Sequence, residues 1–431
     1  MKTTVSTDID ADAAPPAAPT AAEAGRRIAR RLLGAARLRR LALARRALPL
    51  RRLAARGLGL GARARGVNLV GYTRAEMGLG TAARGIAAAL DAAGEPFNVI
   101  NLEAGNASRH GDLTWAHREA KTSGYDVTVV CVHPDNSYPL KTGVPGRVLA
   151  APYVVNLWYW ELPELPDSWA REFAYADEIW VGTRFVQDAV SMKSPLPVVR
   201  VPPVVRAEAS QTFTRGHFGL PAGRFLFLAM FDTHSILERK NPVGVLRAYK
   251  SAFPAEDAGV GLVLKFNNPD PSDPVARAAE EEAAGRGDIF RLDGVMSRDE
   301  VVSLVAAADC FVSLHRSEGF GMGPAEAMYL GKPAVLTDWS GNTDYMTRDN
   351  SAAVGYKLVP LGRDYGPYEA RQVWAEPDVA EAARWMRRLY AEPGLARAMG
   401  ERGRETVRAQ FSAEAAGRVI ARRLEYVRRH A

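Results

Sequence analysis

Residues 309–337, DCFVSLHRSEGFGMGPAEAMYLGKPAVLT, constrain the fold more than any other part of the chain. Residues 309–314 form a short apolar run with the length of a buried strand, and a glycine-rich loop follows it. A helix should begin at Pro324, since proline suits the first helical position, and end before Gly331, which suits the C-terminal cap. Residues 334–337 then predict the next strand. This order indicates a parallel sheet with helices packed on it.

The loop before this helix favours a phosphate. Its glycines leave backbone N–H groups open, and the helix N-terminus adds unpaired N–H groups and the positive end of a dipole. Glu318 lies in the loop and Glu326 in the first helical turn, with seven residues between them. Each carboxylate can accept hydrogen bonds from neighbouring sugar hydroxyls while the backbone holds a diphosphate, so the segment predicts a nucleotide-sugar site. Alternatively, Glu326 only caps its own helix and Glu318 is a solvated loop charge.

Strand-like runs alternate with helical stretches along the rest of the chain, which predicts an α/β protein with parallel sheets. The first half offers such runs at 67–72, 97–101, 126–133, 153–158, 179–182 and 198–201. The second half offers runs at 225–231, 261–266, 289–295, 309–314 and 334–337. Residues 202–222 are rich in proline and polar residues, so we expect the domain boundary there. Two doubly wound, Rossmann-like domains would face each other across a ligand-binding cleft.

The segment from Glu318 to Glu326, EGFGMGPAE, followed by Gly331-Lys-Pro, resembles the signature of the retaining family 4 glycosyltransferases of the GT-B fold. The resemblance extends, more weakly, from about residue 67 to the C-terminus. It implies that Glu318 lies near the transferred sugar and that Glu326 binds the nucleotide ribose. It also implies that the loop backbone contacts sugar and phosphate, at Gly319, Phe320, Gly321 and Met322.

The resemblance also implies a division of the chain. Residues 66–205 would form an N-terminal, acceptor-side domain, and residues 206–405 a C-terminal domain that binds the nucleotide sugar. In this fold the last helical stretch, here within residues 406–431, commonly crosses back to the first domain. Residues 1–65 would precede both domains as a separate arm.

The loop of residues 232–241 supplies candidate cations for the same anion. Asn241 and Pro242 mark a helix start, so Lys240 should lie beside a helix N-terminus, where its charge and the dipole act together. The resemblance implies that a lysine here holds the donor diphosphate. An arginine five positions earlier is usual in the family, but this chain has Ser235, so we expect Arg239 to supply the second cation. The alternative is that both are ordinary surface cations.

The first half offers further candidates with a less specific signal. Gly78 and Gly80 precede a helix expected over 81–93, and by position they match the glycine-rich loop with which GT-B enzymes border the diphosphate; helix packing is the alternative role. His133 ends a strand-like run and can assist acceptor binding or proton transfer. Glu161 ends the next run, where many relatives have a His-Asp pair, and the sequence does not decide between it and His133.

The net charge of +7 is unevenly placed. Residues 1–65 hold 15 Lys and Arg against 4 Asp and Glu, or +11, so the remainder is about −4. The composition of residues 1–22 predicts disorder. The composition of residues 23–58 predicts a helix, but one without a clean amphipathic face. One interpretation is a basic arm that rests on anionic lipid. An arm for nucleic acid would have the same composition, and a tail without a role is the third alternative; no specific nucleic-acid partner is predicted.

No run of about 18 apolar residues and no signal-peptide core is visible, which predicts a cytoplasmic protein, peripheral to the membrane at most. Cys131 and Cys310 lie in apolar runs and should be reduced core residues. Asp8-Ile-Asp10 and Asp10-Ala-Asp12 match a D-x-D metal pattern but fall in the arm, so neither a metal nor another cofactor is predicted.

Together these features predict a metal-independent, retaining hexosyltransferase of polysaccharide biosynthesis. The donor would be a nucleoside-diphosphate sugar and the acceptor a glycan or a lipid-linked saccharide. Departure of the diphosphate leaves negative charge that a preorganised lysine and helix ends can stabilise. A GT-B nucleotide-sugar epimerase is one alternative, and a catalytically silent scaffold that binds sugar nucleotides is another.

Overall fold

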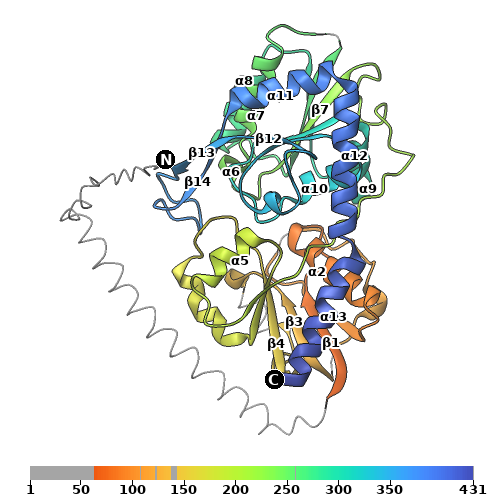
Figure 1. Cartoon of the computed structure of the whole chain (residues 1–431), viewed down its shortest axis with the longest axis vertical. Helices are drawn as coiled ribbons and strands as arrows, with labels where there is room; N and C mark the ends of the chain where they lie inside the picture. The colour runs from red at the N-terminus through yellow and green to blue at the C-terminus, as the bar shows by residue number, and fades with distance from the viewer. Residues whose placement is uncertain (1–62, 107, 122–123, 137–142, 258, 431) are drawn as a thin grey trace, which may run out of the picture.

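The computed structural model describes residues 63–106, 108–121, 124–136, 143–257 and 259–430. These residues form two domains, one above the other in Figure 1, each built around a six-stranded sheet. All strand pairs within both of these sheets are parallel. The predicted α/β class with two doubly wound domains is therefore confirmed. The predicted arm of residues 1–65 lies, except for its last three residues, outside the described residues.

The first sheet has the strand order β2-β1-β3-β4-β5-β6. Its strands are β1 (Ala64–Gly71), β2 (Phe97–Asn101), β3 (Tyr125–Cys131), β4 (Tyr153–Trp158), β5 (Glu178–Val181) and β6 (Val198–Arg200). The connections contain α2 (Gly78–Ala92), η1 (Ala116–Arg118), η2 (Pro134–Asn136), α4 (Gly146–Leu149), η3 (Asp167–Tyr175) and α5 (Arg184–Ser191).

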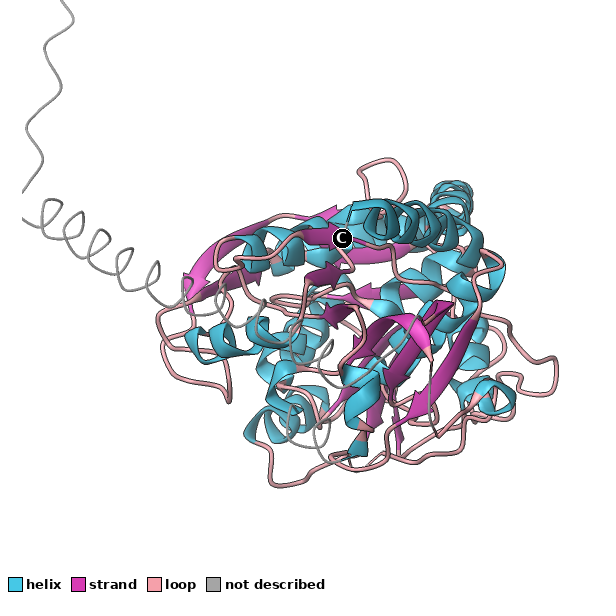
Figure 2. Ribbon diagram, turned by 90° about the horizontal axis from the view of Figure 1, so that it is seen from below, coloured by secondary structure: helices cyan, strands magenta, loops and turns pink. Residues whose placement is uncertain are grey.

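Both faces of this sheet are buried, which explains why its strands read as continuous apolar runs. In β1, Val67 and Leu69 pack in a cluster with α2, whereas Val70 packs in another cluster with Val148 of α4. Figure 2 shows helices, in cyan, on either side of the magenta strands. Residues 201–224 lead to the second domain without a helix or strand.

The second sheet has the order β12-β11-β10-β7-β8-β9. Its strands are β7 (Phe225–Asp232), β8 (Val260–Asn267), β9 (Ile289–Asp293), β10 (Cys310–Ser313), β11 (Ala334–Thr337) and β12 (Ala352–Val354). The helical segments of this domain are α6 (Leu237–Lys240), α7 (Pro242–Ala252), α8 (Pro274–Ala283), α9 (Arg298–Ala307), α10 (Met322–Tyr329), η4 (Gly341–Asp344), α11 (Val379–Ala391) and α12 (Pro393–Gln410). Cys310 and, in the first domain, Cys131 are buried and free, as predicted.

A hairpin of the second domain reaches the first domain. It consists of β13 (Tyr356–Pro360) and β14 (Val373–Pro377), which pair antiparallel. Tyr368 in its loop and Trp374 in β14 pack in one apolar cluster with Trp158, the last residue of β4 in the first domain, and with Trp160 just after it. The hairpin therefore fastens the two domains together on one side of the cleft.

The chain returns to the first domain at its C-terminal end, as predicted for the fold. After α12, α13 (Ala413–His430) lies against α2 (Figure 1). Gly417 allows this close contact, because a Cβ there would stand 2.6 Å from the carbonyl oxygen of Ala89. Arg423 of α13 holds Glu178 of β5 with Nε–O distances of 3.0 and 2.9 Å, and the side chain of Glu178 is fully buried.

Two helix starts differ from the sequence prediction. α10 begins at Met322 rather than Pro324, because Gly321 adopts a left-handed conformation (φ 83°) that lets it act as the N-cap. Its C-terminal end is as predicted: Gly331, at φ 79°, follows the helix, and its N–H donates to the Met328 carbonyl. α2 begins at Gly78 rather than residue 81, so Gly78 and Gly80 lie in its first turn and not in a loop.

None of the helices in the described part of the chain combines the length and the apolar character needed to span a bilayer.

Candidate functional site

The loop between β10 and α10 carries Glu318 and is packed tightly within its own domain. The Glu318 N–H donates to Ser340 Oγ at 2.8 Å, and the Glu318 carbonyl accepts from the Gly341 N–H at 2.9 Å. Gly341 permits this crossing, since a Cβ there would stand 2.1 Å from the Gly319 carbonyl oxygen. The 318–321 loop is therefore held in one conformation by the segment that follows β11.

The Glu318 carboxylate is the centre of a buried ion cluster. Lys240 Nζ lies 2.5 Å from its Oε1 and Arg239 Nη1 lies 3.1 Å from its Oε2. Burial alone would raise the pKa of Glu318, but the neighbouring charges of Lys240 and Arg239 outweigh it and lower that pKa to about 2. Glu318 is thus an ionised carboxylate at neutral pH, with two cations against it.

Local backbone geometry brings these cations to Glu318. Lys240 ends the short helix α6, and Asn241, in a left-handed conformation (φ 55°), turns the chain into α7. The Asn241 side chain caps α7 by accepting from the Gly244 N–H at 3.1 Å, and its Nδ2 donates to the Leu314 carbonyl at 2.9 Å. Asn241 thereby fixes the α6–α7 corner against the end of β10, as expected from its place before Pro242.

Arg239 points inward rather than toward solvent. Its side chain is 6% exposed, and its guanidinium donates to the Ser317 carbonyl at 2.7 Å and to Ser235 Oγ at 2.8 Å. Burial works against its charge, yet Glu318 raises the pKa of Arg239 further, so it stays charged. Ser235 occupies the position where the resembled family has arginine, and here it supports Arg239.

His315, which was not among the residues predicted for the site, lies close enough to Glu318 and Lys240 for their charges to act on it. Its side chain is buried, and its Nε2 lies 2.9 Å from Asn342 Oδ1. Burial lowers the pKa of His315 despite the nearby Glu318 carboxylate, so the imidazole is neutral at pH 7. His315 follows the end of β10 by two residues, and a polar residue just after a strand of a parallel sheet is the signal that could have found it.

Glu326 lies on α10, five residues into the helix and buried. Its carboxylate does not cap its own helix; it accepts from Arg298 Nη2 at 2.5 Å, which also donates to the Arg206 carbonyl. Arg298 is the first residue of α9. Arg84 of α2 in the first domain is near enough for the charge of Arg298 to lower its pKa, after the larger effect of burial. Glu326 is therefore paired with Arg298, whose charge also acts on Arg84 of the first domain.

The first domain meets the Glu318 loop directly. Thr183 Oγ1 donates to the Gly319 carbonyl at 2.9 Å, and Ser317 Oγ donates to the Glu161 carbonyl. A Cβ at Gly319 would stand 2.9 Å from the Trp160 carbonyl oxygen, so this contact requires glycine. The Glu161 carboxylate accepts from the Tyr368 hydroxyl at 2.7 Å. Glu161, a candidate from the sequence, is thus joined to the ion cluster through Ser317.

His133 lies farther along the same face of the first domain. It follows β3, its Nδ1 stands 3.3 Å from Asp135 Oδ2, and its ring packs edge-on against Trp169 with centroids 4.3 Å apart. Trp169 in turn packs against Trp160 at 4.8 Å. His133 is therefore connected with the Glu318 loop through two tryptophans. Within the described residues, His133 and Glu318 form no hydrogen bond or ion pair with each other.

The two glycines of α2 differ in their surroundings. A Cβ at Gly80 would stand 2.1 Å from the Ala75 carbonyl oxygen, so the turn between β1 and α2 needs glycine there for packing. Gly78 is exposed, and a Cβ there would meet no atom of the described residues within 4 Å. Of the two, only Gly78 presents open backbone at the N-terminus of α2.

Within the described residues, no group of three or more His, Cys, Asp or Glu side chains is placed to hold a metal ion.

Comparison with known proteins agrees with this geometry. Residues 233–406, which hold Lys240, Glu318 and Glu326, match the family model of glycosyl transferases group 1. Sucrose-phosphate synthase from Thermosynechococcus elongatus has a similar structure, at 16% identity and a TM-score of 0.59, over 85% of this chain and 100% of that chain. The chain has the GT-B fold. The residues that match the family model make up most of its second domain.

Other GT-B structures show the same likeness. Anabaena HepE, solved in complex with UDP and glucose, is 13% identical with a TM-score of 0.59, over 84% of this chain and 100% of that chain. A glycosyltransferase from Rickettsia africae is 11% identical with a TM-score of 0.58, over 85% of this chain and 98% of that chain. No curated protein sequence matches the chain.

Proposed function

We propose that this protein transfers a hexose from a nucleoside-diphosphate sugar to a glycan or lipid-linked saccharide, with retention of anomeric configuration and without a metal. The observation that carries the proposal is the ion cluster of Glu318, Lys240 and Arg239 beside the N-terminus of α10. It combines a fixed carboxylate, a partly exposed cation and open helix N–H groups. These are the groups that a sugar joined to a diphosphate requires.

In this mechanism Lys240 stabilises the departing diphosphate. Its side chain is 24% exposed, against 6% for Arg239, so Lys240 is the cation that a ligand can reach. Negative charge on the bridging oxygen develops as the glycosidic bond breaks, and a preorganised ammonium group together with helix N–H groups lowers the energy of that state. These groups supply the positive charge that a divalent cation supplies elsewhere, which supports the metal-independent form of the proposal.

Glu318 and Glu326 bind separate parts of the donor. Glu318 accepts hydroxyl hydrogen bonds of the sugar, and Glu326, farther along α10, accepts those of the ribose. The backbone from Gly319 to Met322 contacts sugar and phosphate. Arg239 was predicted to bind the donor, and its burial fits an indirect form of that role, in which it holds Glu318 ionised and in position.

The first domain supplies the acceptor side. His133 and Glu161 follow the neighbouring strands β3 and β4, and both connect to the Glu318 loop through buried aromatic or polar contacts. We assign the acceptor to this face, with Gly78 bordering the diphosphate from the N-terminus of α2. Attachment to anionic membrane through residues 1–65 stays a prediction.

Calorimetry with nucleotides alone tests the division of roles. UDP, GDP and ADP are titrated into the wild-type protein, starting with UDP because the HepE structure contains it. The affinity for the nucleotide that binds should fall at least tenfold in Glu326→Ala. In Glu318→Ala this affinity should be nearly unchanged, and the rate of transfer should fall instead. Equal losses in both variants would contradict the assignment. Product analysis without an acceptor then separates transfer from epimerisation of the donor.

A further inference from the structure

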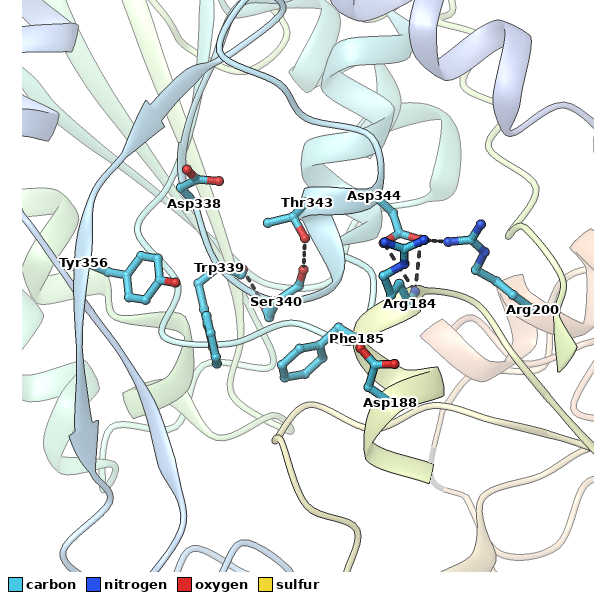
Figure 3. A pocket seen from close by; sticks show the side chains of 10 residues that line it. All are labelled: Arg184, Phe185, Asp188, Arg200, Asp338, Trp339, Ser340, Thr343, Asp344 and Tyr356. Atoms are coloured by element: carbon cyan, nitrogen blue, oxygen red, sulfur yellow. Dashed lines mark hydrogen bonds and ion pairs between the residues drawn. The ribbon is translucent and has the colours of Figure 1, made fainter. Parts of the chain in front are cut away.

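A cavity of about 510 Å³ lies between the two domains, and Ser340, which accepts from the Glu318 N–H, is one of the residues that line it. The first domain contributes α5 and the end of β6, and the second domain contributes the segment after β11 and the start of β13 (Figure 3). Its volume is within the range of small-molecule sites, and such sites often lie at domain interfaces. None of the residues assigned above to donor or acceptor lines it.

Three aromatic rings form one wall of the cavity. Trp339 stands in the middle, with Phe185 at 5.6 Å and an interplanar angle of 73°, and Tyr356 at 5.2 Å and 51°. Phe185 belongs to the first domain and the other two to the second. Tyr356 is 37% exposed despite its size, so part of this aromatic wall faces the open cavity.

The other side chains that line the cavity are polar and carry charges of both signs. Arg200 Nη1 lies 3.3 Å from Asp344 Oδ2, and the Arg184 N–H donates to the same carboxylate at 3.0 Å. Within the described residues, no hydrogen bond or ion pair engages the carboxylates of Asp188 and Asp338 or the guanidinium of Arg184. The carboxylates of Asp188 and Asp338 are thus free to accept hydrogen bonds in the cavity, and the Arg184 guanidinium, whose charge acts on Asp344, is free to donate them.

We propose that this cavity is a second binding site, for a neutral saccharide. The C–H groups of a sugar ring carry slight positive charge and pack on the negative faces of aromatic rings. The hydroxyls of the same ring donate to carboxylates and accept from guanidinium groups. A phosphate or a nucleotide fits poorly, because three aspartates face only two arginines here.

Ser340 connects this cavity with the loop that carries Glu318. Ser340 lines the cavity, and its Oγ accepts from the Glu318 N–H at 2.8 Å. Because both domains line the cavity, a saccharide held there also favours one relative position of the domains. The site is therefore suited to hold a saccharide chain while transfer takes place in the neighbouring cleft.

The test measures saccharide binding in the presence of saturating UDP. Maltose, cellobiose, lactose, mannobiose and chitobiose are examined by saturation-transfer NMR, and those that bind are titrated by calorimetry with wild type, Tyr356→Ala and Leu358→Ala. Leu358 is the matched control, since it lies on the same strand, is 49% exposed and does not line the cavity. At least one disaccharide should bind, at least tenfold more weakly to Tyr356→Ala and unchanged to Leu358→Ala.

Several results would overturn the proposal. They are no binding by any disaccharide, equal binding to both variants, or binding weakened by His133→Ala, which would place the sugar in the acceptor side of the cleft. Displacement of the sugar by inorganic phosphate would show an anion site instead. Binding rather than turnover is measured, so the outcome does not depend on the transfer activity.

Discussion

Neutralising Glu318 should cost the second domain about 3 kcal/mol of unfolding free energy at pH 7. The pKa of Glu318 is about 2 in the folded protein, against an ordinary value of 4.5. Each unit of difference corresponds to about 1.4 kcal/mol, so the ionised form is favoured by about 3 kcal/mol in the folded state. Glu318→Gln removes this contribution and leaves Arg239 and Lys240 without their carboxylate, although the shape of the side chain is kept.

The direction of the Glu318 pKa shift determines how this stabilisation changes with pH. Because the folded-state pKa lies below the unfolded one, the stabilisation is complete above pH 4.5 and is lost as the pH falls toward 2. Urea denaturation followed by tryptophan fluorescence, at several pH values between 7 and 3, measures the gap between wild type and Glu318→Gln. The gap should narrow to roughly half by pH 3.

Glu376→Gln is the control for this experiment. Glu376 pairs with Arg316 at 2.7 Å, but its side chain is 42% exposed, so its loss should cost at most about 1 kcal/mol. A gap for Glu318→Gln that is no larger than this control, or one that stays constant from pH 7 to pH 3, would refute the argument that charge in the buried cluster stabilises the domain.

Further variants test other parts of the structure. Lys240→Ala should lower kcat/KM for transfer by roughly 10² to 10³, the usual cost of removing one preorganised group that stabilises developing charge, and an unaltered kcat/KM would make it a surface cation. Ser340→Ala should lower stability in thermal denaturation by about 1–3 kcal/mol, because the buried Glu318 N–H loses its acceptor. Ser340→Gly should cost about 1 kcal/mol less, since glycine relieves the positive φ of 78°, and a less stable glycine variant would contradict this. Arg423→Leu should cost about 3–5 kcal/mol by leaving Glu178 buried without its cation. Arg429→Leu, on the exposed face of the same helix, should cost under about 0.5 kcal/mol, and similar losses in both arginine variants would show that Glu178 does not anchor α13.

Strands buried on both faces were the most predictable part of the fold. β4 and β11 have the bounds expected from their apolar runs, because each lies inside its sheet and needs apolar side chains in both directions. β13 was missed for the opposite reason. Its residues are mostly exposed, so neither a continuous run nor a clean alternation marks it.

The residues of the site could be predicted from the sequence, but the contacts between them could not. A glycine-rich loop marked Glu318 in the sequence, and the start of a helix marked Lys240. Their ion pair joins residues 78 positions apart, which only the sheet order β10-β7 brings together. The inward direction of Arg239 and the support from Ser340 and His315 also depend on tertiary contacts that no local pattern encodes.

The return of α13 to the first domain determines the order in which the domains can fold during synthesis. Ala416, Ile420, Leu424 and Val427 of α13 belong to the same apolar core as β1, β3 and α2. The first domain is made early but cannot complete this core until residues 413–430 have left the ribosome. The sheet of the second domain and its helices, residues 225–410, form a continuous stretch that is complete before then. Domains of this chain should therefore reach their native state in the reverse of their order along the sequence, and the exposed face of α2 would need protection from aggregation in the meantime.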